Sequence, residues 1–219
     1  MSVGDGNDFI HSDMSQNSSI NAGDGDDTIA NICSGNATID AGAGNDSISN
    51  AGYDHAIIDA GTGDDTIKID TADSASVNGG AGNDYIINYS DYSGDPKGDG
   101  GDYSTLGGGK GNDTIVNVLY MGARRGGNHI RFTYNDGDDN DLIQGFNKTS
   151  TLQIGDGNAS YSKETNGSDI VITVGEGSIT LKDTASLSSV EIDGVNPFDI
   201  VGTEGADSIN KIGRASCRE

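Results

Sequence analysis

The chain has 219 residues, a formal net charge of -23 at pH 7 and a hydrophobic content of only 32%. An ordinary chain of this composition would be disordered, because buried apolar surface would not offset the entropy lost on ordering. The negative charge also argues against nucleic acid and anionic membranes as partners. Only five of the 35 acidic residues are Glu, and 35 residues are Gly. Asp and Gly are typical of tight turns, and Asp oxygens suit hard cations.

A repeated phrase, G-x-G-[ND]-D-x-I, occupies the first part of the chain at steps of 19 residues. Its aspartates are Asp8, Asp27, Asp46, Asp65 and Asp84. The aliphatic residues two places after them are Ile10, Ile29, Ile48, Ile67 and Ile86. A second aliphatic series at the same step comprises Ile20, Ile39, Ile58 and Val77. Each unit therefore has two halves, and each half has one turn and one short strand that offers a large aliphatic residue to an interior.

The repeat predicts an all-β fold, a parallel β-roll or β-solenoid of 19-residue coils followed by a β-rich capping module. A helix would need apolar residues three to four places apart, and the many Gly and Asn residues would weaken it. Each coil is expected to contain two strands and two turns, and coils stack about 4.8 Å apart. Stacking places equivalent residues in columns, so that Ile29 lies next to Ile48 and Asp27 next to Asp46.

A column of aspartates is unfavourable by itself, because carboxylates at this spacing repel by roughly 1 kcal/mol per neighbouring pair even in water. In the second half of each unit the equivalent positions have no carboxylate; they are Ser18, Ala37, Ala56 and Ala75. We therefore expect cations along one edge of the roll and none along the other. The glycines beside each aspartate permit left-handed dihedrals that would turn carbonyl groups inward.

A hard cation could then bind about six oxygens from two stacked turns, at 2.3–2.6 Å. Magnesium would prefer to keep its waters. Zinc would require His or Cys, and the three histidines, His11, His55 and His129, share no spacing. The alternative without metal is that Asp and Asn stabilise the turns through hydrogen bonds to their own backbone. Catalysis by paired carboxylates, as in a glycosidase, is a further alternative that we do not favour.

These turns resemble the nonapeptide G-G-x-G-x-D-x-U-x of RTX, or haemolysin-type, calcium-binding repeat proteins, where U is a large aliphatic residue. The best matches are residues 79–87 and 108–115, whereas the copies that begin at Ala22, Ala41 and Ala60 have Ala in place of the first Gly. The resemblance covers about residues 3 to 116. It implies a parallel β-roll with Ca²⁺ between successive turns, in a secreted or cell-surface bacterial protein that often folds only when it meets calcium outside the cell.

The resemblance assigns the metal role to two glycines and one aspartate in each turn. These residues are Gly4, Gly6, Asp8, Gly23, Gly25, Asp27, Gly42, Gly44, Asp46, Gly61, Gly63, Asp65, Gly80, Gly82, Asp84, Gly109, Gly111 and Asp113. Family members usually have the motif along both edges, whereas this chain has it along one. We therefore expect several calcium ions, about half the usual number for the length of the roll.

Four segments are expected along the chain. Residues 1–117 form the calcium-binding roll, with an insertion about 88–106 that lengthens the step from Asp84 to Asp113 to 29 residues. Residues 118–198 form the capping module, because a final coil would otherwise expose an unpaired strand edge. Residues 199–211 resemble the start of another repeat. Residues 212–219 resemble a translated sequencing adapter, so we expect the chain to be a fragment, and it shows no signal peptide or membrane span.

The capping module has short alternating segments, TLQIG, DIVITVG, GSITLKD and SSVEIDG, which predict strands. Gly175 and Glu176 precede Gly177 between two of these segments and predict a hairpin. Residues 134–146 contain an imperfect turn, with Asp139 in the place of the second Gly and Asp141 in the place of the metal-binding Asp.

Two functions remain open from the sequence. The first is a calcium-binding structural or adhesive segment of a large secreted or cell-surface bacterial protein, without enzymatic activity. The second is an accessory repeat region of a secreted enzyme, such as a protease or lipase, whose catalytic domain lies elsewhere. A surface carbohydrate or protein partner is a further possibility for the tyrosines near the insertion, Tyr85, Tyr89, Tyr92 and Tyr103. No nucleic acid partner is expected.

Overall fold

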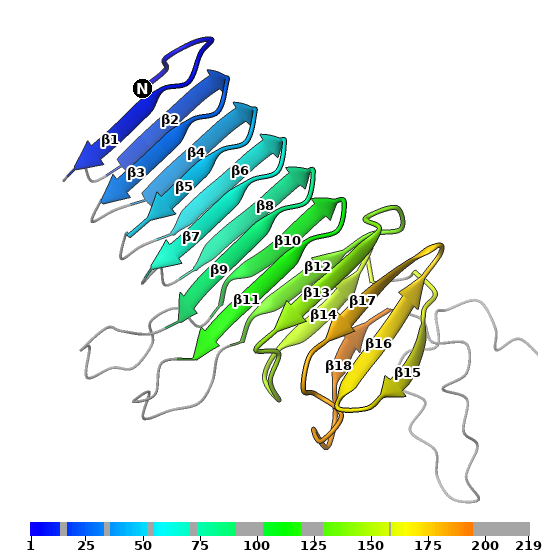
Figure 1. Ribbon diagram of the computed structural model, residues 1–219. Helices are drawn as coiled ribbons and strands as arrows, with labels where there is room; N and C mark the ends of the chain where they lie inside the picture. Colours follow the sequence, from blue (N-terminus) through cyan, green and yellow to red (C-terminus); the bar gives the residue numbers. More distant parts are fainter. Residues whose placement is uncertain are drawn as a thin grey trace, which may run out of the picture.

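The computed structural model describes residues 1–13, 17–32, 36–51, 55–70, 74–90, 103–119, 129–157 and 159–194. Every regular element in these ranges is a β-strand. Among the same residues there is no helix with the length and apolar character needed to cross a membrane. The strands form two sheets that run the length of the molecule (Figure 1).

The two sheets take alternate strands of the chain. In spatial order, the ten-stranded sheet contains β1 (Phe9–Asp13), β3 (Thr28–Ile32), β5 (Ser47–Asn50), β7 (Thr66–Asp70), β9 (Tyr85–Ser90), β11 (Thr114–Leu119), β13 (Asn140–Gln144), β17 (Gly177–Leu181), β16 (Asp169–Val174) and β15 (Ser162–Asn166). The eight-stranded sheet contains β18 (Glu191–Asp193), β14 (Thr151–Ile154), β12 (Arg131–Tyr134), β10 (Thr105–Lys110), β8 (Ala75–Ala81), β6 (Ala56–Thr62), β4 (Asn36–Ala43) and β2 (Asn17–Asp24).

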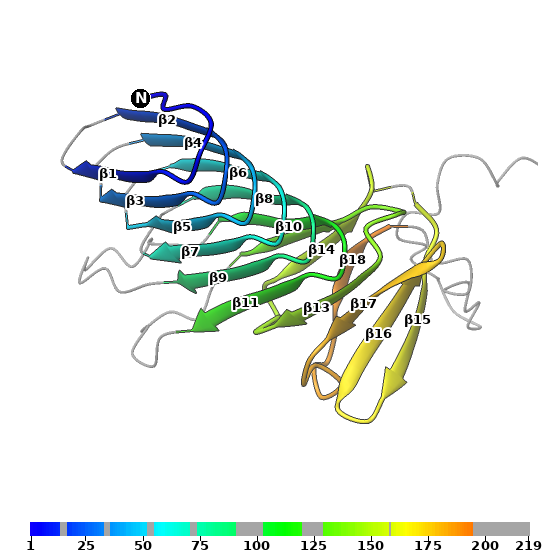
Figure 2. The ribbon, with the colours of Figure 1, turned by 45° about the horizontal axis from the view of Figure 1, so that its top comes forward.

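Neighbouring strands of the repeat region are parallel and equivalent in sequence, which confirms the predicted β-roll. Ile29 pairs with Ile48, and Ile39 pairs with Ile58, so each coil is displaced by one repeat. Figure 2 shows the two sheets facing each other, with the turns joining them along one edge. The insertion leaves this register intact, because Ile86 pairs with Ile115 across the longer step. Residues 91–102 of the insertion lie outside the described residues.

The core of the coils contains two columns of large aliphatic and aromatic residues, one from each sheet. The column of the ten-stranded sheet is Ile10, Ile29, Ile48, Ile67, Ile86, Ile115 and Ile143. The column of the eight-stranded sheet is Ile20, Ile39, Ile58, Val77, Leu106, Phe132 and Leu152. Burying each such side chain contributes about 1.5–3 kcal/mol. A chain with a low apolar content can therefore fold, because the stacked coils bury one large apolar side chain from each sheet in every coil.

A ladder of buried asparagines follows the aliphatic column of the ten-stranded sheet and was not predicted. Asn31 donates from Nδ2 to Oδ1 of Asn50 at 2.6 Å, and Asn88 donates in the same way to Asn117 at 3.0 Å. Ile69 takes this column in the coil between Asn50 and Asn88. The Nδ2 atom of Asn50 is consequently buried without a hydrogen-bond partner.

Replacing Asn88 with Ala is expected to destabilise the folded protein by about 2 kcal/mol, because Oδ1 of Asn117 loses its donor while remaining buried. The measurement is the urea midpoint of the variant in calcium. Ser49→Ala on the outward face of β5 is the control and should leave the midpoint unchanged. Equal urea midpoints for Asn88→Ala and the wild type would mean that a water molecule donates the missing hydrogen bond to Oδ1 of Asn117.

The coils continue beyond the repeats and end in an antiparallel hairpin. Strand β13 pairs with β11, and β17 pairs with β13, in the same parallel sense as the repeats. Strands β16 and β17 form the hairpin expected at Gly175. Strand β15, which was not predicted, adds the last strand and is exposed along its whole length. A short polar edge strand of this kind discourages pairing with other chains.

Several sequence-based expectations fall outside the described residues. They concern Tyr92, the segment 199–211 and the segment 212–219. Residues 33–35, 52–54 and 71–73, which follow β3, β5 and β7 in the sequence, also lie outside. At the start of β4, β6 and β8, the residues Ala37, Ala56 and Ala75 form one buried column, in agreement with the small neutral residues expected there.

Candidate metal centre

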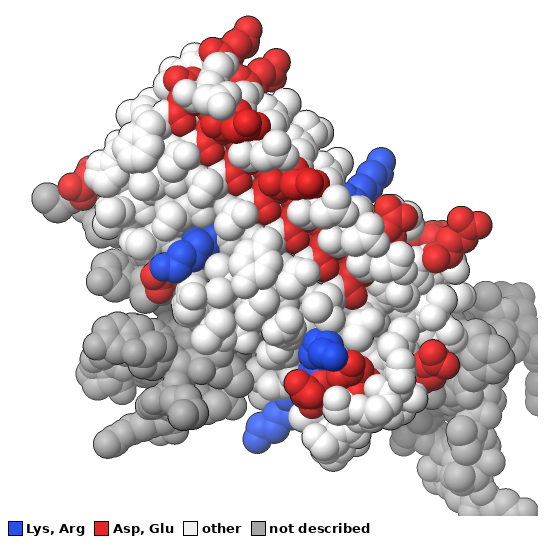
Figure 3. Space-filling model, viewed as in Figure 1, with Lys and Arg blue, Asp and Glu red and all other residues white. Residues whose placement is uncertain are grey.

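The repeated aspartates form one line of carboxylates along an edge of the roll (Figure 3). Each of them precedes a strand of the ten-stranded sheet, and those from Asp27 to Asp113 are at most 2% exposed. Asp8, in the first coil, is half-buried. Asp141 continues the line in β13, so the place predicted for it from the imperfect turn is correct. We call this set the carboxylate ladder; its members are Asp8, Asp27, Asp46, Asp65, Asp84, Asp113 and Asp141.

One oxygen of each ladder carboxylate after Asp8 joins two coils. Oδ1 of Asp27 accepts the backbone N–H of Asp8 at 2.7 Å, and Oδ1 of Asp46 accepts that of Asp27 at 2.7 Å. The same bond recurs along the ladder at 2.7–3.0 Å and includes the pair across the insertion, Asp84 and Asp113. The insertion therefore leaves this part of the ladder intact.

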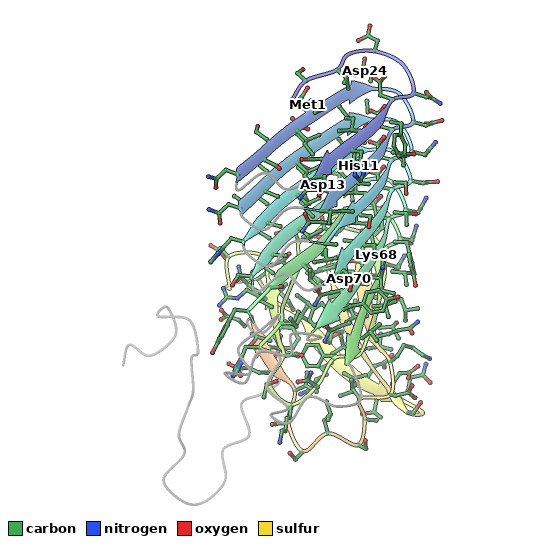
Figure 4. The ribbon with its side chains drawn as sticks, turned by 90° about the vertical axis from the view of Figure 1, so that its left-hand side faces the viewer. Met1, His11, Asp13, Asp24, Lys68 and Asp70 are labelled. Atoms are coloured by element: carbon green, nitrogen blue, oxygen red, sulfur yellow. The ribbon has the colours of Figure 1, made fainter. Side chains whose placement is uncertain are left out.

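The other oxygen of each inner carboxylate has no partner. The Oδ2 atoms of Asp27, Asp46, Asp65, Asp84 and Asp113 are buried and accept no hydrogen bond. A buried carboxylate oxygen without a partner costs several kcal/mol when the group is ionised, unless a cation compensates it. The two ion pairs found within the described residues, Lys68–Asp70 and Lys182–Asp169, do not involve the ladder. Figure 4 shows Lys68 and Asp70 together on β7.

Burial and mutual repulsion raise the pKa of five ladder aspartates. Burial, followed by the negative charge of neighbouring aspartates, raises the pKa of Asp46, Asp65 and Asp113 from 3.8 to about 6. The same causes raise the pKa of Asp84 to about 7 and that of Asp141 to about 8. The N–H bonds between coils oppose these shifts without cancelling them. These five aspartates therefore hold a proton more tightly than an ordinary carboxyl group does.

A second column, of Asn and Asp residues, lies beside the ladder and can be compared with it. The exposed residue before each ladder aspartate alternates between Asn and Asp over most of the array; the column is Asn7, Asp26, Asn45, Asp64, Asn83 and Asn112. Their side chains also bridge coils, since Asn45 Oδ1 accepts the N–H of Asp64 at 2.8 Å. Asn and Asp are thus interchangeable in this outer column, and no two neighbours are both charged. The buried ladder retains the charge in every coil.

The paired glycines of each turn adopt backbone conformations that other residues rarely reach. In the coils from Gly23 to Gly111, the first glycine has φ of 101–114° and the second has φ of 126–143°. They also lie directly against the preceding coil, because a Cβ on Gly63 would be 2.0 Å from the carbonyl oxygen of Gly44. Gly6 has φ of 115°, but neither it nor Gly4 has a neighbour within 4 Å on that side, since they belong to the first turn.

The turn that follows the last repeat departs from this pattern. Asp139 stands in place of the second glycine and has φ of 60°. Asp138 is buried and accepts the backbone N–H of Asn135 at 2.6 Å, and burial raises its pKa. Asp138 was not singled out from the sequence, because its burial depends on the fold of this one irregular turn. The hydroxyl of Tyr134 donates to the carbonyl of Asp139 at 2.6 Å and holds the turn.

The residues of the ladder edge fit a hard cation of the calcium type. The unpartnered Oδ2 atoms supply charged oxygen donors, and the glycines bring two coils close enough for backbone carbonyls to contribute. Within the described part of the chain, no three His, Cys, Asp or Glu side chains converge as a ready metal cluster. Backbone oxygens would therefore have to complete the ligand set, which calcium accepts and zinc does not.

The tyrosines near the insertion do not form one exposed cluster in the described structure. Tyr103 is 64% exposed, and its ring stacks on that of His129 with centroids 5.1 Å apart. Tyr85 is 42% exposed on β9, and Nζ of Lys68 lies 5.1 Å from the ring centroid of Tyr89. A carbohydrate or protein partner at these residues stays a prediction.

No protein-family model and no curated protein match the chain. Among solved structures, it is similar to the extracellular lipase LipA from Serratia marcescens, with 18% sequence identity and a TM-score of 0.41. The similarity covers 85% of this chain and 38% of the lipase chain, so this chain spans less than half of that protein.

Proposed function

We propose that the chain is a calcium-binding β-roll of the RTX type, in which Ca²⁺ binds along the carboxylate ladder and stabilises the fold. The proposal is supported above all by one observation, the line of buried Oδ2 atoms that have no partner. The outer column strengthens it, because Asn replaces Asp there without disturbing the bridges between coils. If the ladder aspartates served only to form turns, Asn could replace them as it replaces Asp in the outer column.

In this proposal the ladder residues have two tasks. Oδ1 fixes the distance between successive coils, and Oδ2, together with glycine carbonyls, faces the ion. Calcium supplies the positive charge that a column of buried carboxylates lacks. These oxygens are brought together only in the folded chain. The free energy of calcium binding therefore adds to the free energy that stabilises the fold. Millimolar calcium is the range in which extracellular modules bind, so loading outside the cell is expected.

We assign the segment a structural or adhesive role in a secreted or cell-surface bacterial protein. An accessory role beside a catalytic domain in a longer protein is the alternative. The two roles differ in what the rest of the protein contains and share the calcium-binding edge. Sequencing of the complete reading frame distinguishes them: further repeats favour the adhesive role, and a nucleophile or zinc-binding motif favours the enzyme.

Asp65→Asn is expected to weaken calcium binding by about tenfold or more and to lower the number of ions bound, because a charged oxygen ligand is lost. The Asn side chain keeps Oδ1 as the acceptor for the N–H of Asp46, so the bridge between coils survives. Calcium binding is measured by titration calorimetry, and folding is followed by far-UV circular dichroism. Magnesium at the same concentration should produce neither change.

Asp64→Asn is the matched control, because it removes one negative charge from the adjacent exposed position. Asn45 and Asn83 occupy the same column in the neighbouring coils, so calcium binding should be unaffected. If Asp64→Asn and Asp65→Asn weakened calcium binding equally, the acidic surface would attract cations in general and the ladder would not be a specific site. A β-sheet spectrum that is unchanged by chelator, without heat of calcium binding, would support a metal-free solenoid instead.

A further inference from the structure

Strand β9 presents a tyrosine on the outer face of the ten-stranded sheet where neighbouring coils have a small residue. The equivalent positions in the three preceding coils and in the next one are Thr28, Ser47, Thr66 and Thr114. Tyr85 is 42% exposed. The roll forms with Thr or Ser at this position, so the fold itself does not explain a large aromatic ring that remains in contact with water.

Half-buried apolar side chains surround Tyr85 on the same outer face. Strand pairing aligns β9 with β11 and β11 with β13, while the alternate residues Ile86 and Asn88 point into the roll. Figure 3 shows mostly uncharged side chains over β9 and β11, in a chain whose net charge is -23. We call this set the β9 face; its members are Tyr85, Ile87, Tyr89, Val116, Val118 and Leu142.

Polar groups border the β9 face on the adjacent strand. Lys68 and Asp70 are outward residues of β7, which pairs with β9, and Nζ of Lys68 lies 2.9 Å from Oδ2 of Asp70. Both side chains are partly exposed, so the pair presents N–H donors and a carboxylate acceptor side by side. The same Nζ lies 5.1 Å from the ring centroid of Tyr89 and holds that ring at the border of the face.

The size and charge of the β9 face restrict what can bind there. The face extends about 13 Å along β9 and about 10 Å across three strands. A stable protein interface needs about 800 Å² from each partner, which is several times larger. An anionic partner would be repelled by the net charge, and a cationic partner would bind more strongly at the ladder edge. The face therefore fits a small neutral ligand.

We propose that the β9 face binds a neutral saccharide, with the ring of Tyr85 as the platform on which one sugar ring stacks. A sugar ring has an apolar face of C–H groups and a rim of hydroxyl groups that donate and accept hydrogen bonds. The C–H face lies on Tyr85 and over Ile87, and the hydroxyl groups face Lys68 and Asp70. A purely apolar ligand would remove this ion pair from water without replacing its hydrogen bonds. This binding function is separate from the proposed calcium function.

Affinity electrophoresis of the whole chain in about 10 mM calcium tests the proposal. The native gels contain one soluble neutral polysaccharide each: dextran, galactomannan, xyloglucan or laminarin. We expect at least one of them to retard the wild-type protein. Tyr85→Thr should weaken that binding by about tenfold or more, because a central aromatic side chain carries much of the binding energy. The variant should fold normally, since Thr66 and Thr114 occupy the same position in the adjacent coils.

Two further variants serve as controls, and far-UV circular dichroism checks that each variant is folded. Tyr85→Phe keeps the aromatic ring and should retain most of the binding. Tyr103→Thr removes a tyrosine that is 64% exposed but lies beside β10 of the other sheet, where it stacks on His129. Its mobility in the polysaccharide gels should match that of the wild type.

Three results would overturn the proposal. The first is a wild-type protein that none of the four polysaccharides retards. The second is equal retardation of the wild type and Tyr85→Thr, which would place the sugar elsewhere on the molecule. The third is self-association of the wild type in sedimentation that Tyr85→Thr abolishes, which would identify the β9 face as a contact between copies of this chain.

Discussion

Without calcium, the protein is expected to become more stable as the pH falls from about 8 to about 5. The pKa values of Asp46 and Asp65 in the folded protein are about 6, that of Asp84 is about 7 and that of Asp141 is about 8. All lie above the ordinary value of 3.8, so protonation favours the folded state. This contribution is complete below the unfolded pKa and disappears as the pH rises through 6 to 8. Each pKa unit corresponds to about 1.4 kcal/mol, so several such groups produce a large effect.

With saturating calcium, the dependence on pH should reverse. The ion binds the deprotonated carboxylates, so protons and calcium compete for the ladder. Stability should then decrease as the pH falls through the same range. Both trends are measured as urea midpoints between pH 5 and 8, once in desalted protein and once in about 10 mM calcium. This concentration lies above the dissociation constants of weak extracellular calcium sites. Parallel pH profiles in the two conditions would contradict cation binding at the ladder.

Gly63→Ala is expected to destabilise the roll by about 3 kcal/mol or more. Gly63 has φ of 127°, a region that an alanine enters only with strain, and its Cβ would lie 2.0 Å from the carbonyl oxygen of Gly44. The flanking coils would have to separate to accept the methyl group, and this would break the bridge between Asp46 and Asp65. The loss appears in the urea midpoint and in the calcium concentration needed for folding.

Thr62→Ala is the control for this prediction, because Thr62 is the exposed residue between two glycines of the same turn. Ala43 and Ala81 stand at its position in the neighbouring coils, so the substitution should change stability by less than about 0.5 kcal/mol. If Gly63→Ala were as stable as Thr62→Ala, the coils would be less closely packed at this edge than the structure indicates.

The fold was predictable because two independent columns keep the same step of 19 residues. Ile29 and Ile39 identify the two strands of one coil, and Asp27 identifies the turn between coils. The buried asparagines could also have been found, since Asn31 is two residues after Ile29 and must face the same side of its strand. They were missed because Asn is more often a turn residue than an interior one.

The use of the carboxylate oxygens could not be predicted from the sequence. The repeat places Asp46 next to Asp65, but it does not say that one oxygen bridges the coils while the other has no partner. That division depends on side-chain rotation and on the short distance that Gly44 and Gly63 permit. The burial of Asp138 likewise depends on an irregular turn that no repeat describes.

The two edges of the roll differ in how much length they tolerate. The connections that contain the ladder aspartates, from β2–β3 to β10–β11, always have three residues between strands. The connections on the opposite edge range from three residues after β1 to fourteen between β9 and β10. The ladder edge therefore has connections of constant length and fixes the spacing of the coils. The opposite edge accepts additional residues without a change in strand register. The roll could therefore serve as a scaffold that displays a foreign peptide inserted after β5 or β7. Such an insertion should be tolerated, because each doubling of loop length lowers the free energy of unfolding by only about 0.6 kcal/mol.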